Sequence, residues 1–121
     1  MSHQSFEKFD DADLIRMFAD TAATLGEIVN NWLGSGAKES HKLNKIGNIL
    51  RSRGKHTRLL LTPLLRSDNR FVKYYAAIEL EGLLPDPCRR IIEENAKQGD
   101  AIAGDAGMHL HAIESGIYRP D

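Results

Sequence analysis

The stretch LLLTPLLRSDNRFVKYYAAIEL, residues 59–80, decides the fold class of this chain. An apolar run containing Pro63 leads into the polar turn Ser67–Asn69, and a second apolar run without glycine or proline follows. Proline removes a backbone donor, so we expect a short helix over residues 57–66 that is kinked or ended at Pro63. The polar turn can cap the next helix, and the whole stretch therefore predicts an antiparallel helical hairpin.

The second helix of this hairpin, expected over residues 69–83, is apolar on nearly every side. At about 100° per residue, its apolar residues divide into Val72, Ala76, Leu80 and Leu83 on one side and Phe71, Tyr75 and Ile78 on the other. A helix without a polar face is usually a buried helix. We therefore expect this helix to form the centre of the domain.

The N-terminal part of the chain predicts a pair of longer helices. Asp10 or Asp11 can cap the first, and Gly54 can end the second, which is expected over residues 37–53. Apolar residues at spacings of three and four mark the buried stripe of each helix: Leu14, Phe18, Thr21, Leu25, Ile28 and Trp32 in the first, and Leu43, Ile46 and Leu50 in the second. This spacing is typical of amphipathic helices.

The C-terminal part predicts two more helices. Asp86 is expected to cap the first of them, with Pro87 in the first helical position and an end near residue 97. The second is expected over residues 101–115. The chain is therefore predicted to be all-α, with about six helices and no sheet.

An internal repeat relates the helices expected over residues 69–83 and 101–115. At an offset of 30 residues, small or apolar positions match in five pairs: Val72 with Ile102, Ala76 with Ala106, Ala77 with Gly107, Leu80 with Leu110, and Leu83 with Ile113. Repeats of about 30 to 50 residues built from helix pairs are typical of α-solenoids. The two helices are therefore expected to occupy equivalent places in two stacked units.

Residues 59–83 resemble a HEAT-type helical repeat. The matching features are the leucines and Pro63 in the first helix, Asn69 in the turn, and Val72–Lys73, Ala76–Ala77 and Leu80 in the second helix. The resemblance implies one domain over residues 1–121, a short α-α superhelix of the HEAT or armadillo type. Residues 1–54 would form an N-terminal helical pair or cap, residues 57–115 two HEAT-like pairs, and residues 116–121 a tail.

A second resemblance concerns a family of small bacterial helical domains of unknown function. It rests on Tyr75–Ala77, Pro85–Pro87, Gly104–Met108 and residues 115–121. It implies a bacterial, intracellular protein with an armadillo-like fold, and no activity or catalytic residue. In HEAT-like units a basic residue in the place of Lys73 commonly pairs with an acid of a turn, but Asn69 stands where aspartate is frequent.

The composition fits one soluble domain. The chain has 121 residues, of which 41% are hydrophobic and 27% charged, so it can bury a core without covalent staples. Cys88 is the only cysteine, which excludes an intrachain disulfide. No apolar stretch approaches the roughly 20 residues of a membrane-spanning helix, and residues 1–13 lack a signal-peptide pattern. We expect a cytoplasmic protein that does not bind membranes.

The net charge of −1 conceals a basic middle segment. Residues 1–33 carry 2 basic and 6 acidic groups, residues 34–73 carry 10 and 2, and residues 74–121 carry 4 and 9. The middle segment can bind a polyanion, or it can neutralise the acidic ends within the fold or within a homodimer. We favour neutralisation, because a near-neutral pI and the lack of interleaved aromatic residues argue against a dedicated nucleic-acid site.

Two places in the sequence could carry chemistry. Asp105 and His109 share a helix face, as a general-base or metal-binding pair could, but no nucleophile or third ligand has a matching spacing. Cys88 lies in the first turn of a helix beside Arg89 and Arg90, where thiol pKa values fall, yet no histidine accompanies it by spacing. We expect a structural pair and a packing cysteine, with no catalytic residue, no metal and no cofactor.

The small side chains of the last helix form a strip. Its members are Ala101, Gly104, Met108 and Ala112. We expect close helix packing at this strip, with Tyr118 lying over it. The alternative is a shallow groove for a partner, in which Met108 is an adaptable contact.

The favoured function is non-enzymatic protein binding, because solenoids expose an extended surface rather than enclose a small substrate. A narrower version is a bacterial accessory or immunity-type protein. The candidate partner-binding residues are Lys38, Lys42, Lys45, Arg51, Met108 and His111. The first alternative is nucleic-acid or polyanion binding through residues 38–58, and the second is an enzyme that uses Asp105 and His109.

If the basic segment neutralises the acidic ends, the protein should not bind nucleic acid at about 150 mM salt, where the Debye length is about 8 Å. Fluorescence anisotropy with random duplex and single-stranded oligonucleotides, at two salt concentrations, measures this. Sub-micromolar binding that survives physiological salt, and that is lost when Lys42 and Lys45 are replaced by glutamate, would contradict neutralisation and make nucleic acid the favoured partner.

Overall fold

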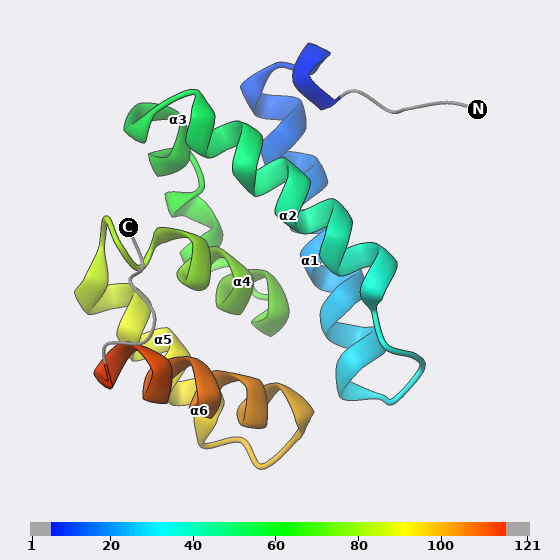
Figure 1. Cartoon of the computed structure of the whole chain (residues 1–121), viewed down its shortest axis with the longest axis vertical. Helices are drawn as coiled ribbons and strands as arrows, with labels where there is room; N and C mark the ends of the chain where they lie inside the picture. Colours follow the sequence, from blue (N-terminus) through cyan, green and yellow to red (C-terminus); the bar gives the residue numbers. More distant parts are fainter. Residues whose placement is uncertain (1–5, 116–121) are drawn as a thin grey trace.

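The computed structural model describes residues 6–115, which form α-helices and short 3₁₀ turns and contain no strand (Figure 1). The helices are α1 Asp11–Asn30, α2 Ala37–Ser52, α3 Lys55–Leu59, α4 Arg70–Leu80, α5 Pro85–Ala96 and α6 Ala101–Glu114, with 3₁₀ turns η1 Phe6–Lys8 and η2 Thr62–Arg66. The prediction of an all-α chain with six helices is confirmed. None of the described helices has the length and apolar character needed to cross a membrane.

Polar side chains cap three of the helices. Asp10 accepts a hydrogen bond of 2.8 Å from the backbone N–H of Asp13 at the start of α1. Asn69 accepts from two N–H groups at the start of α4, at 2.9 and 3.2 Å, and Asp100 accepts from that of Ala103 at 2.9 Å in α6. Each cap satisfies a donor that the helix leaves without a partner, and such caps typically contribute about 1 kcal/mol.

Three predicted boundaries are wrong. The helix expected over residues 57–66 is divided into α3 and η2, with Pro63 in the first turn of η2. Helix α5 begins at Pro85 rather than Pro87, so that Asp86 lies in its first turn and does not cap it. The fixed φ of proline suits the first helical position, and Pro85 is the earlier of the two prolines. Helix α4 ends at Leu80, three residues before the predicted end.

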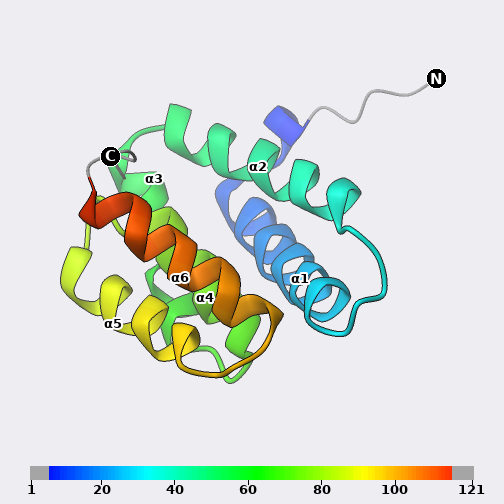
Figure 2. The ribbon, with the colours of Figure 1, turned by 60° about the horizontal axis from the view of Figure 1, so that its bottom comes forward.

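The helices pack in two antiparallel pairs with α4 between them (Figure 1). Helix α2 lies along α1, α6 lies along α5, and α4 packs against both α1 and α5. Helix α6 also reaches α1, as the turned view shows (Figure 2). The first and the last α-helix of the described chain are therefore in contact with each other.

Helix α4 lies at the centre, as predicted. Five of its residues are buried: Val72, Tyr74, Ala76, Ala77 and Leu80. Tyr74 is the largest fully buried side chain among the described residues, although the sequence pattern did not single it out. Phe71, Tyr75 and Ile78 pack at the edge of the same core and are only partly buried.

Helices α1 and α4 approach closely at Gly26. A Cβ atom on this glycine would lie 2.1 Å from Cγ of Phe71, a distance at which one of the two helices would have to move. Glycine is therefore required here for its missing side chain, a role that the sequence pattern of α1 does not reveal.

The internal repeat matches the structure only in part. Ile102 and Ala106 of α6 are buried, as are their counterparts Val72 and Ala76 in α4. Gly107 is exposed, whereas its counterpart Ala77 is fully buried. Helix α4 has neighbours on opposite sides, whereas α6 has an outer face that the described residues leave open. Fewer of the repeated small or apolar positions are therefore buried in α6 than in α4.

Replacing Leu80, which is 0% exposed, with alanine should lower the free energy of unfolding by about 2 to 5 kcal/mol, because a buried leucine leaves a cavity when truncated. Replacing the exposed Lys42 with alanine should change it by no more than about 0.5 kcal/mol. Urea denaturation followed by circular dichroism compares the two variants. A larger loss for the lysine variant would contradict the central position of α4.

Candidate functional site

The lysines predicted to bind a partner lie on the outer face of α2. Lys38, Lys42 and Lys45 are exposed, and no ion pair to them occurs within residues 6–115. Lys38 and Lys42 line a shallow hollow with residues of α1, among them Asp20 and Thr24. These lysines are free to meet an anionic partner.

The arginines of the basic segment are used within the fold. Arg51, also predicted to bind a partner, pairs with Glu79 of α4 at 2.8 Å. Arg58 is buried and donates to the backbone carbonyl of Glu79 at 2.9 Å. Arg53 pairs with Asp11 at 2.7 Å and also donates to two backbone carbonyls near the start of α1. Neutralisation within the chain therefore holds for these arginines and does not extend to the lysines.

A wide, open hollow of about 810 Å³ lies between the C-terminal end of α1 and the outer face of α6. We call it the α1–α6 groove. Its walls include Val29, Asn30 and Trp32 from α1 and the turn after it, and Asp100, Gly104 and Met108 from the capping residue and body of α6. Trp32 is 82% exposed and Met108 is 75% exposed. Of the predicted partner-binding residues, Met108 alone lines this groove.

Trp32 was expected in the buried stripe of the first helix, and that prediction is wrong. Helix α1 ends at Asn30, and Trp32 follows in the left-handed region with φ of 57°. This backbone turn takes the side chain out of the helical register that would have buried it. A tryptophan in this conformation is uncommon and marks a position of interest. Leu33 beside it is also exposed.

At Gly104, the small-residue strip of α6 does not make the close packing that was predicted, at least not with residues 6–115, and the neighbouring Gly107 is equally open. A Cβ atom added to Gly104 or Gly107 would have no described neighbour within 4 Å, and both glycines are exposed. Glycine inside a helix costs roughly 0.5 to 1 kcal/mol relative to alanine. No close contact within residues 6–115 requires a residue without a side chain at either position. The predicted contact of Tyr118 with the strip lies outside the described residues.

A second cavity, about 320 Å³, lies between the two helix pairs and is lined by residues of α1, α2, α4 and α6. We call it the inner cleft. Its walls include Phe18 and Leu25 of α1, Ser40 and Asn44 of α2, and Tyr75 and Glu79 of α4. Val29 and Asp105 line both cavities, so the inner cleft and the α1–α6 groove adjoin at these two residues.

Asp105 stands where the two cavities meet. Its carboxylate accepts a hydrogen bond of 2.5 Å from the hydroxyl of Tyr74. Burial, this hydrogen bond and the negative charge raise the pKa of Tyr74 well above its ordinary value of 10. Burial and the charge of Asp105 raise the pKa of Tyr75 in the same way. Both phenols therefore remain neutral donors at any physiological pH.

The predicted pair of Asp105 and His109 has a different arrangement from a general-base dyad. Asp105 is held by Tyr74. Burial lowers the pKa of His109 below its ordinary value of 6.5, while the charges of Asp105 and Glu81 act in the opposite direction. Within residues 6–115, no cluster of three or more metal-ligating side chains is present. His111, a predicted partner-binding residue, is exposed one turn from the end of α6.

Cys88 is a packing residue, as predicted. It is fully buried, and burial together with the nearby charge of Glu81 raises the pKa of its thiol to about 12. Glu81 itself is 1% exposed and accepts a hydrogen bond of 3.0 Å from Arg89. The sequence pattern missed this buried carboxylate, which lies just after the last residue of α4.

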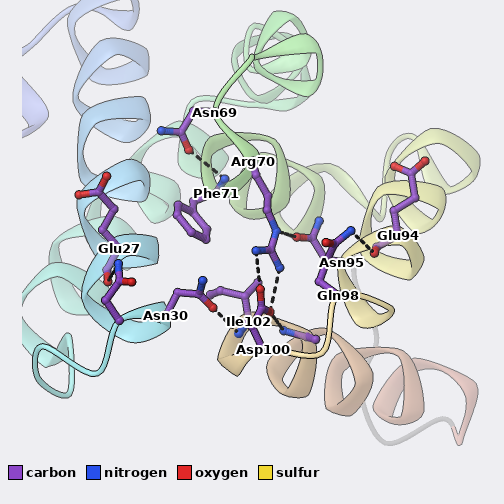
Figure 3. Close-up of polar contacts among 12 residues, drawn as sticks. Glu27, Asn30, Asn69, Arg70, Phe71, Glu94, Asn95, Gln98, Asp100 and Ile102 are labelled. Carbon is purple, nitrogen blue, oxygen red and sulfur yellow. Dashed lines mark hydrogen bonds and ion pairs between the residues drawn. The ribbon is translucent and has the colours of Figure 1, made fainter.

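The position of α6 depends on Arg70, the first residue of α4 (Figure 3). Its guanidinium donates to both carboxylate oxygens of Asp100, at 2.6 and 2.9 Å, and to the side chain of Asn95 in α5 at 2.8 Å. Asp100 caps α6 at the same time, and Asn30 of α1 accepts from the N–H of Ile102. One polar cluster thus joins four helices beside the groove.

In HEAT-like units a basic residue in the place of Lys73 commonly pairs with an acid of a turn, and the sequence left that pairing open because Asn69 stands in the place of the acid. In the structure Arg70, three residues before Lys73, forms the ion pair with Asp100. Lys73 lines a separate polar hollow beside Glu94 and Gln98. Arg70 and Asp100 are 30 residues apart, the offset of the internal repeat. The sequence signal that could have identified this pair is Asp100, an acidic residue directly before α6 at the repeat offset from Arg70.

The comparisons with known proteins concern the fold. No protein-family model and no curated protein matches this sequence. The structure is similar to the crystal structure of the protein RPA1889 from Rhodopseudomonas palustris CGA009, with a TM-score of 0.84 and 22% sequence identity. The match covers 98% of this chain and 100% of that chain. At this identity the similarity shows that the all-helical fold also occurs in a bacterial protein.

The Arg70 pair should make stability depend on acid pH. Hydrogen bonding to Arg70 is the main cause that lowers the pKa of Asp100 from 3.8 to about 2. A lowered pKa gives stability that is present above about pH 4 and is lost as the pH falls towards 2. Thermal melts of the Asp100→Asn variant should show lower stability at neutral pH and a shallower fall between pH 4 and 2. The exposed Asp86→Asn variant should retain the slope of the parent, and an unchanged slope in Asp100→Asn would contradict this assignment.

Proposed function

We propose that this chain is a non-enzymatic protein-binding module and that the α1–α6 groove is its binding face. The observation that carries the proposal is the exposure of Trp32 and Met108, at 82% and 75%, on the walls of one open groove, with Leu33, 73% exposed, next to Trp32 in the chain. Single exposed apolar residues are ordinary on soluble proteins, but a cluster of large ones beside a concave surface is typical of interaction sites. Tryptophan and methionine are also enriched in the buried centres of interfaces.

The exposed glycines support the same assignment. Gly104 and Gly107 are exposed on α6 and present no side chain there, which allows the backbone of a partner to approach closely at these two positions. We propose that the stacked helices form a short HEAT-like superhelix, as the resemblance of residues 59–83 implies, and that the protein acts in a bacterial cytoplasm. An accessory or immunity-type role is the narrower version.

The candidate reactive groups support a non-enzymatic role. Cys88 is buried and its thiol pKa is about 12, so the thiol is protonated at neutral pH and is a weak nucleophile. Asp105 is engaged with the hydroxyl of Tyr74, which in turn stays protonated. An enzyme centred on Asp105 and His109 therefore remains the least favoured alternative.

Polyanion binding is the second candidate, and one observation favours it. Lys38, Lys42 and Lys45 share the exposed side of α2 and have no ion pair within the described part of the chain. The arginines that would strengthen such a surface, Arg51 and Arg53, are paired with carboxylates. Because these arginines are paired, the exposed basic surface of α2 carries less positive charge than the number of basic residues in the segment 34–73 indicates.

Affinity purification with quantitative mass spectrometry tests the groove when wild-type protein and variants are compared as baits. Replacing Trp32 and Met108 together with alanine should deplete the partner at least about tenfold, because such residues dominate binding energy. The matched control is Leu60→Ala, which removes another exposed apolar side chain, 47% exposed, outside the groove lining.

Both variants should keep the melting temperature of the parent, since exposed side chains contribute little to stability. A partner that is retained equally by the wild type, the double variant and the control would contradict the proposed face. A wild-type dimer that becomes a monomer only in the double variant would identify a second copy of the chain as the occupant.

A further inference from the structure

We propose that the occupant of the α1–α6 groove is an amphipathic helical segment of a protein partner that inserts one lysine or arginine past Asp105 into the inner cleft. This inference rests on the proposed function and adds the chemistry of the ligand. It is carried by the adjacency of the two cavities at Val29 and Asp105, the charges along their walls and the hydrogen bond that Asp105 accepts from Tyr74.

The groove and the inner cleft adjoin at Val29 and Asp105, which line both cavities. A long side chain that leaves a segment in the groove at this boundary therefore comes next to Asp105. The groove is about 810 Å³ and the inner cleft about 320 Å³. The first volume can take an apolar helix face, and the second can take the end of one long side chain and ordered water.

The charged side chains that line both cavities are all carboxylates. They are Asp100 and Asp105 in the groove and Glu79 and Asp105 in the inner cleft. Asp100 is matched by Arg70 through two hydrogen bonds, and Glu79 is paired with Arg51 at 2.8 Å. Two of the three negative charges are therefore already balanced by arginines of the chain itself.

Asp105 is the carboxylate that has no such partner. Its contact is with the neutral hydroxyl of Tyr74, and within residues 6–115 no lysine or arginine pairs with it. Burial lowers the pKa of His109, one turn further along α6, so its imidazole adds little positive charge at neutral pH. The hydrogen bond from Tyr74 orients the carboxylate while leaving its negative charge to be met by a ligand.

The walls suit a cation on a long stem. The side chains of Tyr75, Phe18 and Leu25 line the cleft and can cover the methylene groups of a lysine or arginine, and Ser40 and Asn44 supply oxygen atoms on its α2 side. Long basic side chains characteristically bury their stems on apolar and aromatic surface and keep the charged end with polar groups. An acidic segment would meet unbalanced negative charge and should be rejected.

A phage-displayed library of random peptides of about 16 residues, which corresponds to four or five helical turns, is the probe. Selection on the full-length protein should enrich peptides with apolar residues at helical spacing and one lysine or arginine at a constant position. Counter-selection on the Trp32→Ala, Met108→Ala double variant should remove them. The enriched peptide then serves for calorimetry with wild-type and variant proteins.

The deciding measurement is a double-mutant cycle. Asp105→Asn removes the charge and keeps an oxygen that accepts from Tyr74, and it should weaken the peptide at least about tenfold. Replacing the constant basic residue of the peptide with norleucine should weaken binding by a similar factor. When the Asp105→Asn protein is combined with the norleucine peptide, the affinity should fall no further than with either change alone. The matched control Glu93→Gln, an exposed carboxylate on α5, should leave the affinity unchanged.

The outcomes separate this inference from the proposed function. Enriched peptides that depend on Trp32 and Met108 but carry no constant cation, or that show independent effects in the cycle, would overturn the inference and leave the binding face intact. Peptides that bind the double variant as well as the wild type would overturn both. An unchanged melting temperature of Asp105→Asn ensures that weaker binding is not loss of fold, and Asp105→Glu, which restores the charge, should recover part of the affinity.

Discussion

The bidentate pair of Arg70 and Asp100 fixes the place of the last helix, and the groove depends on it. Arg70 begins α4, Asp100 caps α6, and Asn95 of α5 completes the contact of the guanidinium (Figure 3). Such an arrangement joins three helices at their ends, where backbone donors need partners, so one ion pair also satisfies a helix terminus. A helix held at its N-terminus and packed along α5 presents a defined outer face to α1.

Packing around α4 explains why that outer face stays open. Helix α4 is covered by α1 and α5, and the close approach at Gly26 brings Phe71 against α1. Helix α6 uses its buried residues, Ile102 and Ala106, against the core and turns Gly104 and Met108 outward. Since α1 ends at Asn30 and the chain then turns outward at Trp32, apolar side chains from two distant segments gather at one groove.

The charges of the chain follow a physical division between arginine and lysine. Arginines bridge elements, as the pairs of Arg51 with Glu79 and Arg53 with Asp11 show, because a planar guanidinium can bind carboxylates and carbonyls together. The lysines of α2 stay in solvent, where a strongly hydrated ammonium costs nothing to keep. The negative charges of Glu79, Asp11 and Asp100 are thereby balanced by arginines, whereas no lysine or arginine of residues 6–115 pairs with Asp105 beside the cavities.

The sequence by itself determined the all-α class, the central place of α4 and its cap by Asn69, because periodicity, proline and capping act over a few residues. It also singled out Met108 and the small-residue strip of α6. It misplaced Trp32, since a stripe does not show that a helix stops two residues earlier, and it missed Tyr74, Glu81 and the Arg70 cluster, which unite positions 8 to 31 residues apart. Only the tertiary structure decided which charged side chains are paired and where the open cavities lie. These properties depend on distances between residues of different helices, which the residue pattern within one helix does not contain.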